Sequence, residues 1–158
     1  SARNAITALV ILFFVGSFLF SLFDSSTTVD NIAVGDCLQA PEDDEFNAVD
    51  AVECTEPHDF EVFAAIDLST VSSEFGLAAP YPGSLTIEMA ALEACDESFE
   101  SYVGVDYWSS SLDFTTFMPT IEGWEEADDR LVQCLLFQPG DGEFGILDSI
   151  RSFRNSGF

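Results

Sequence analysis

The stretch VECTEPHDFEVFAAIDL, residues 52–68, decides the fold, because it combines a cysteine, the only histidine of the chain and its clearest strand pattern. Every second residue from His58 to Leu68 falls on one face, and that face is apolar apart from His58 itself. Asp59 and Glu61 fall on the opposite face and are expected to point outward. The pattern predicts a half-buried strand with His58 at the entrance to its inward face.

Pro57 and His58 open this strand, since proline cannot donate a hydrogen bond to a sheet ladder. We expect the imidazole nitrogens of His58 to satisfy neighbouring backbone or carboxylate groups. The alternative is a metal or hydrolytic site. A lone histidine with only outward-facing acids nearby is a poor metal site, and the sequence contains no GxSxG or HExxH motif. We therefore predict a structural role.

Composition limits the class of protein. The chain has 158 residues, enough for about one domain, and 29 acidic residues against 4 basic ones give a formal net charge of −25. Such a charge repels nucleic acid and anionic lipid surfaces, so a nucleic-acid partner is excluded. Two explanations stay open: a solvated surface in a salty setting, or a docking face for a cationic partner.

Residues 5–23, AITALVILFFVGSFLFSLF, carry no charge and rise about 28 Å as a helix, close to the roughly 30 Å of a bilayer core. We predict an uncleaved transmembrane anchor rather than a cleaved signal peptide or a buried helix. Arg3 precedes the span, so residues 1–4 are expected in the cytoplasm. Residues 24–31 would form a short tether, and residues 32–158 an extracytoplasmic domain at the plasma membrane.

The four cysteines also point to an oxidising compartment, since their number is even and no CxxC pair occurs. Zinc clusters favour closely spaced pairs, so we expect two disulfides instead. An antiparallel pair of strands near residues 32–38 and 48–54 would place Cys37 beside Cys54. This pairing is one of three possible connectivities.

Residues 84–104 predict the principal helix, with Ser84 as N-cap and Gly104 as C-cap. Apolar residues at steps of three and four predict its buried stripe: Leu85, Met89, Leu92, Cys95, Phe99 and Tyr102. Cys95 on that stripe would bridge to Cys134 in a strand over residues 130–138.

A further strand is expected near residues 112–118 and a short final strand or turn near residues 145–150, with Trp124 in the loop before the strand over residues 130–138. The parts add up to an α+β domain: a small disulfide-bonded antiparallel sheet with one principal helix.

Acidic residues gather in two loops and form the candidate docking surface: Glu42, Asp43, Asp44, Glu45, Glu125, Glu126 and Asp128. Neither cluster has the alternating ligands of an EF-hand loop, so we expect no calcium site. Arg130 is expected to pair with Asp128, Asp129 or another nearby acid and to lie beside Trp124.

The motifs VGDCL, CTEPHDFEV, YPG before a helical cysteine, P-x4-W, DDRLVQC and GILDSI together resemble the septum formation family of actinobacterial membrane-anchored envelope proteins. The resemblance covers roughly residues 34–151. It implies that Pro57, His58, Trp124, Asp129 and Arg130 form the structural motif of the domain and supports the disulfide pairing above. Asp128 and Asp148 stand where the family commonly has glycine, which bears on the turn geometry there.

Three hypotheses for the function follow. The first is a non-enzymatic accessory or interaction subunit of a larger bacterial membrane complex, with the acidic face toward a basic c-type cytochrome of a respiratory complex. The second is a septum-associated envelope protein of cell division, and the third is a His58-dependent enzyme. We expect no cofactor, no metal and no enzymatic activity.

Overall fold

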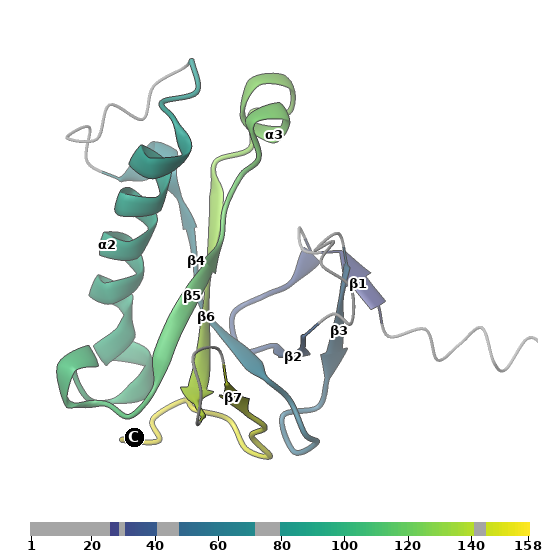
Figure 1. Ribbon diagram of the computed structural model, residues 1–158, viewed down its shortest axis with the longest axis vertical. Coiled ribbons are helices and arrows are strands. Elements are labelled where there is room, and N and C mark those ends of the chain that lie inside the picture. Colours follow the sequence, from purple (N-terminus) through teal and green to yellow (C-terminus); the bar gives the residue numbers. More distant parts are fainter. Residues whose placement is uncertain (1–25, 29–30, 41–47, 72–79, 141–144) are drawn as a thin grey trace, which may run out of the picture.

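A computed structural model describes residues 26–28, 31–40, 48–71, 80–140 and 145–158. Within these residues the chain forms one antiparallel seven-stranded sheet with the order β1-β3-β2-β4-β6-β5, and β7 pairs with β6. Figure 1 shows helix α2 along one side of β4, β5 and β6, with β1 to β3 on the other side. The predicted α+β class, an antiparallel sheet with one main helix, is confirmed.

Strands β1 (Ser26–Thr28), β2 (Cys37–Gln39) and β3 (Ala48–Val52) form one arm of the sheet. Cys37 faces Val52 across the β2–β3 pair, which brings the cysteine two residues after Val52 within reach. The Cys37–Cys54 disulfide forms there, with 5.2 Å between the Cα atoms. The hairpin predicted from the sequence and its disulfide are therefore both present.

The centre of the sheet is β4 (Phe60–Asp67), β6 (Leu131–Pro139) and the edge strand β5 (Asp113–Phe117). The register of β4 against β6 shifts between Val62 and Ala64, a bulge that changes which side chains face which layer. Both faces of this part of the sheet are covered. The larger core lies under α2, and a smaller one lies on the other face, formed by Ile32, Leu38, Val49, Val62 and Leu135.

Helix α2 (Ser84–Val103) begins one residue earlier than the capping pattern predicts. Gly83, not Ser84, occupies the N-cap, and it makes no side-chain bond there. Gly104 caps the other end with φ 96° and donates its N–H to the carbonyl of Glu100, as predicted. A residue with a Cβ would be strained at that positive φ.

The predicted buried stripe of α2 is wrong in its first half. Leu85, Met89 and Leu92 are exposed, with 67%, 53% and 41% of their surfaces accessible. In this half the residues in contact with the core are Ile87, Ala90 and Ala91. The second half buries Ala94, Cys95, Phe99, Tyr102 and Val103. Alanine at these positions lets the helix backbone lie close to the sheet, so the larger side chains on the neighbouring face point to solvent.

Cys95 of α2 bonds to Cys134 of β6, with 5.8 Å between the Cα atoms, so the helix is fastened to the middle of the sheet as predicted. Both cysteines are fully buried. Around them pack the aromatic rings of Phe63, Phe99 and Phe114 in edge-on and tilted contacts. This disulfide is thus embedded in the main core.

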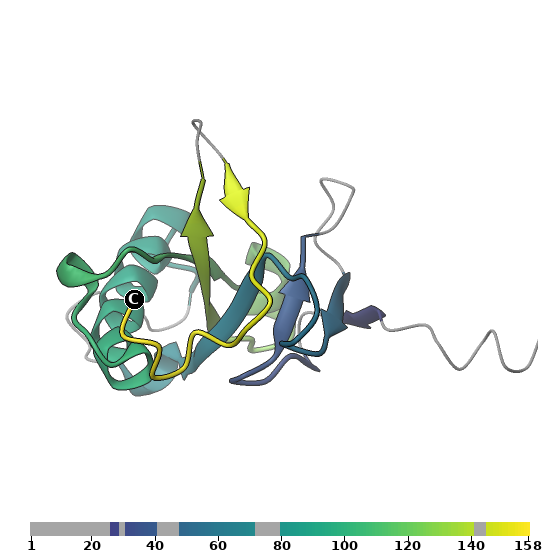
Figure 2. The same cartoon turned by 90° about the horizontal axis from the view of Figure 1, so that it is seen from below.

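Short elements complete the fold: η3 (Leu68–Thr70), η5 (Tyr107–Ser109), α3 (Ile121–Glu126) and β7 (Ile146–Leu147). Trp124 lies in α3 and is buried, so the prediction that it sits in a loop is wrong. Thr120 makes this helix possible, because its side chain accepts a hydrogen bond from the N–H of Gly123 at 2.9 Å. After β7 the chain crosses the end of the sheet toward α2 (Figure 2).

Among the residues described, no helix is both long and apolar enough to cross a bilayer. Residues 5–23, where the sequence predicts a membrane anchor, lie outside the described residues, as do residues 1–4 and half of the predicted tether, residues 24–25 and 29–30.

Candidate functional site

The most polar part of the interior is a cluster around Glu61, where strand β4, helix α2 and the final segment, residues 149–158, meet. Glu61 is fully buried, contrary to the prediction that it points outward. Its carboxylate accepts hydrogen bonds from the hydroxyls of Tyr102 and Ser152, both at 2.6 Å, and from the N–H of Phe153 at 2.5 Å. Three donors from two other parts of the chain stabilise the charged carboxylate.

His58 lies beside this cluster and is 1% exposed, which agrees with its predicted position on the inward face. Its Nδ1 lies 2.8 Å from the carbonyl oxygen of Glu56, so this nitrogen carries the proton in the neutral ring. Its Nε2 has no hydrogen-bond partner among the described residues. The expectation that both nitrogens are satisfied is therefore met at one nitrogen and not at the other.

The backbone of His58 joins the final segment to the sheet. Its N–H donates to the carbonyl of Ser149 at 2.9 Å, and its own carbonyl accepts from the N–H of Ser149 at 2.8 Å. The imidazole ring meets the buried ring of Phe153 edge-on, with 6.1 Å between centroids. His58 thus holds the strand entrance against Ser149 and Phe153.

Cys37, His58 and Glu61 offer potential metal ligands within 4.8 Å of one another. The sulfur of Cys37 is bonded to Cys54, however, and a metal requires a free thiolate. The carboxylate of Glu61 already accepts three hydrogen bonds. In its disulfide-bonded form this cluster therefore does not fit a metal ion, and its chemistry is that of a structural clamp.

The final segment also supplies hydrogen-bond donors to the last carbonyl groups of α2. The last carbonyls of a helix lack partners within it. Here the N–H of Asn155 donates to the carbonyl of Tyr102 at 2.8 Å, and the N–H of Gly157 donates to that of Val103 at 3.0 Å. The Arg154 guanidinium lies over the Tyr102 ring, 4.6 Å from its centroid.

The surroundings of Tyr102 in this cluster change its pKa. Burial of its ring, followed by its hydrogen bond and charge contact with Glu61, raises the pKa of Tyr102 to about 12. Burial together with Asp113 also raises the pKa of Tyr107. Both tyrosines are therefore neutral hydrogen-bond donors at neutral pH.

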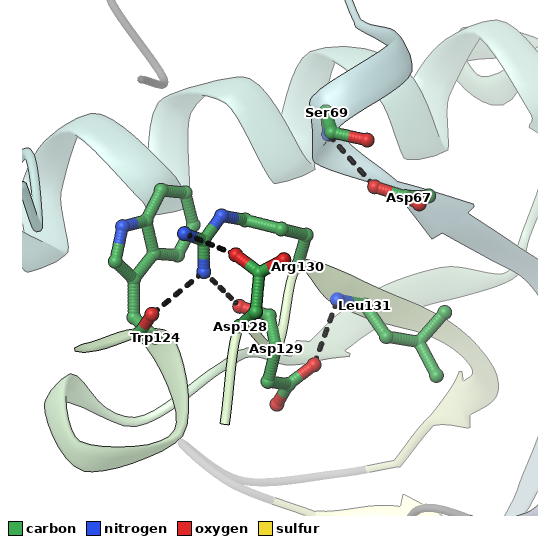
Figure 3. A network of polar contacts seen from close by, with 7 residues as sticks. All are labelled: Asp67, Ser69, Trp124, Asp128, Asp129, Arg130 and Leu131. Carbon is green, nitrogen blue, oxygen red and sulfur yellow. Dashed lines mark hydrogen bonds and ion pairs between the residues drawn. The ribbon is translucent and has the colours of Figure 1, made fainter. Parts of the chain in front are cut away.

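A second polar site surrounds Arg130, at the entrance to β6 (Figure 3). Its guanidinium stacks over the Trp124 ring at 3.8 Å and donates to the backbone carbonyls of Trp124 and Asp129 at 2.9 and 2.8 Å. It also pairs with Asp128 at 2.9 Å, the kind of pairing expected from the sequence. Because these groups already occupy the guanidinium, Arg130 holds the α3–β6 turn together and is not open to an anion.

The acids around this turn differ in their roles. The carboxylate of Asp129 accepts from the N–H of Leu131 at 2.9 Å. Hydrogen bonding by Ser69, with a smaller contribution from Arg130, lowers the pKa of Asp67 (Figure 3). Asp128 adopts φ 55°, the left-handed conformation that favours the glycine of the family pattern. Asp148, the second departure from that pattern, is not among the residues with positive φ.

The candidate docking surface is described only in part. Glu125, Glu126 and Asp128 are exposed around the end of α3, while Glu42, Asp43, Asp44 and Glu45 lie outside the described residues. The cluster that the sequence did not predict is that of Glu61. The signal for it was weak: Phe63 and Ala65, which share the face of Glu61 in strict strand alternation, are apolar, so that face was not plainly a polar one.

Comparison with known proteins places these features in a family. The model of the septum formation family matches residues 34–156. Two relatives from Mycobacterium tuberculosis, strains CDC 1551 and H37Rv, are each described as an uncharacterized membrane protein and are 31% identical over 118 residues. The match covers 73% of this chain and 26% of each relative, so the chain spans about a quarter of their length. No solved structure matches it significantly. By the extent of the family match, the chain belongs to the septum formation family.

Proposed function

We propose that this chain is a non-enzymatic, membrane-anchored domain of the bacterial cell envelope that acts in septum formation by binding other proteins. Membership of the septum formation family over residues 34–156 is the observation that carries the proposal. The relatives described as membrane proteins fit it as well. Neither the family nor the relatives point to a respiratory partner, so the septum hypothesis is favoured over the cytochrome hypothesis.

The polar sites support a binding role over catalysis. The carboxylate of Glu61 is occupied by three donors, and Arg130 by Trp124, Asp128 and Asp129. Both disulfides consume the cysteines, so no thiolate is left as a nucleophile. Two disulfides also suit an oxidising compartment outside the cytoplasm.

The test is localisation in the native host. A tagged full-length copy should concentrate at division sites, and deletion of the gene should delay or misplace septa. Even labelling around the cell with normal septa after deletion would contradict the proposal. Recovery of a stoichiometric respiratory complex from mild detergent after a salt wash would instead favour the accessory-subunit hypothesis.

The anchor and the enzymatic alternative have their own controls. A reporter active only outside the cytoplasm, fused after residue 158, should be active with residues 5–23 present and inactive without them.

A His58→Ala copy that folds and restores normal septa would argue against catalysis by His58. Loss of septation by a correctly folded and located His58→Ala protein would favour the enzyme.

A further inference from the structure

The exposed face of α2 is apolar in its first half and acidic toward its end. Its first half presents Leu85, Met89 and Leu92, which are four and three residues apart and therefore lie on one face of the helix. Each exposes between 41% and 67% of its surface. Large apolar side chains grouped in this way on a soluble surface mark an interaction site more often than scattered single residues do.

Acidic side chains border this apolar face and continue it toward the end of the helix. Those on the exposed side of α2 are Glu88, Glu93, Asp96, Glu97 and Glu100. No basic residue occurs in α2. Among the described residues, Arg130 and Arg151 stack on rings outside α2, and Arg154 lies over the ring of Tyr102, which is buried in the last turn of α2. We call the apolar residues Leu85, Met89 and Leu92 with these five acids the α2 face.

We propose that the α2 face binds a cationic amphipathic helix of a partner protein, with its apolar side on Leu85, Met89 and Leu92 and its basic end over Asp96, Glu97 and Glu100. This deepens the proposed function and rests on it. Charge complementarity selects the occupant, because a net charge of −25 repels both a second copy of the chain and an anionic lipid surface. From Leu85 to Glu100 the face is about 22 Å long, which corresponds to a partner helix of roughly 15 residues.

The two methionines of the chain provide the test. Met89 lies in the α2 face, and Met118, which is 38% exposed between β5 and α3, serves as an internal reference. The full chain with ¹³C-methyl methionine, in phosphatidylcholine nanodiscs, is titrated with a 15-residue helical peptide that carries leucines on one face of its first half and lysines in its second half. The Met89 methyl signal should shift saturably, while that of Met118 should not.

Three comparisons separate the apolar from the electrostatic contribution. A peptide of the same composition with its leucines spread around the helix should bind at least tenfold more weakly. Leu85→Ser combined with Leu92→Ser should weaken binding of the first peptide at least tenfold, whereas Ile150→Ser, at a position with the same 67% exposure, should leave it unchanged. Replacing Asp96, Glu97 and Glu100 by their amides should weaken binding and reduce its dependence on salt.

Three results would overturn the proposal. Equal shifts of both methyl signals, or equal binding of the two peptides, would mean attraction by charge alone. A Met89 methyl shielded from a soluble paramagnetic probe in the free chain would mean that another segment or a second copy already covers the face, and sedimentation would distinguish these two. A chain that does not bind the peptide but localises normally to septa would refute the role of the α2 face alone. A chain that binds the peptide but does not localise to septa would refute the proposed function alone.

Discussion

At the scale of single residues, Glu61 does more for this fold than its place in a strand suggests. A buried carboxylate is costly unless hydrogen bonds replace its water, and here the donors come from α2 and from residues 152 and 153. Glu61 therefore joins strand, helix and final segment at one point. A polar side chain in such a position specifies one arrangement, because any other would leave it unsatisfied.

Glu61→Gln tests this role with almost no change of shape. The amide nitrogen cannot accept a hydrogen bond, so it would face at least one of the donors Tyr102, Ser152 and the N–H of Phe153. We expect a loss of about 2 to 3 kcal/mol in the free energy of unfolding, measured in urea. Glu100→Gln, on the exposed side of α2, should change it by less than about 0.5 kcal/mol. Equal effects of the two variants would refute the role given to Glu61.

Asp128 allows a test of backbone strain, because it holds φ 55° at a position where the family commonly has glycine. Its ion pair with Arg130 contributes little, since 90% of the Asp128 side chain is exposed. We expect Asp128→Gly to leave stability unchanged or raise it by up to about 1 kcal/mol, and Asp128→Ala to lower it by about 1 kcal/mol. Thermal unfolding of both variants measures this. A glycine variant less stable than the alanine variant would show that the carboxylate matters more than the conformation.

Tyr102 predicts how stability depends on alkaline pH. Its pKa of about 12 in the folded protein exceeds the ordinary value of 10. The folded state therefore keeps a proton that the unfolded chain loses, and the stabilisation is complete below pH 10 and lost as the pH rises to 12. The urea midpoint should fall over this range, and less steeply in Tyr102→Phe. Because the pKa of Tyr107 is raised as well, the variant Tyr107→Phe measures how much Tyr107 contributes to the same pH dependence. Identical slopes in Tyr102→Phe and the parent protein would refute the assignment.

At the scale of elements, local patterns predicted strands and disulfides well. The alternation after His58 gave β4, and the hairpin argument gave Cys37–Cys54, because these features depend on neighbouring residues or on a short loop. Cys95–Cys134 spans 39 residues, and its prediction rested on the place of Cys95 on the helix stripe and on the family resemblance. Helix α2 was also predicted, but its buried side was assigned to Leu85, Met89 and Leu92. Periodicity alone did not distinguish this exposed apolar stripe from the face that packs on the sheet, because the packed face there consists of Ile87 and the small residues Ala90, Ala91 and Ala94.

The burial of Glu61 could not be predicted in the same way. Strand alternation places it outward, whereas Tyr102 of α2 and the returning residues 149–158 cover it. These contacts join residues 41 to 92 positions apart in the sequence. The Pro57–His58 pair was placed correctly at the strand entrance, yet its partner Ser149 is equally distant in sequence.

The two disulfides predict different losses when they are removed. Cys95–Cys134 closes a sequence separation of 39 residues and Cys37–Cys54 one of 17. Loop-closure entropy then gives about 4 kcal/mol for the first and about 3 kcal/mol for the second. Double cysteine-to-alanine variants, unfolded in urea, should therefore both lose stability, with the helix–sheet pair losing more. If the variant without Cys37–Cys54 loses more unfolding free energy, the native contacts around that disulfide contribute more to stability than the entropy of the unfolded chain does.

At the scale of the whole molecule, the formal net charge of −25 opposes compaction. Added salt screens this repulsion over a distance that falls from about 30 Å at 0.01 M to about 10 Å at 0.1 M. We expect the melting temperature to rise between these concentrations and then level off, equally in sodium and potassium chloride. A rise with calcium far beyond that in sodium chloride of equal ionic strength would indicate specific cation sites in place of general screening. A melting temperature that does not change with salt would mean that the acids lie far enough apart for water alone to screen them.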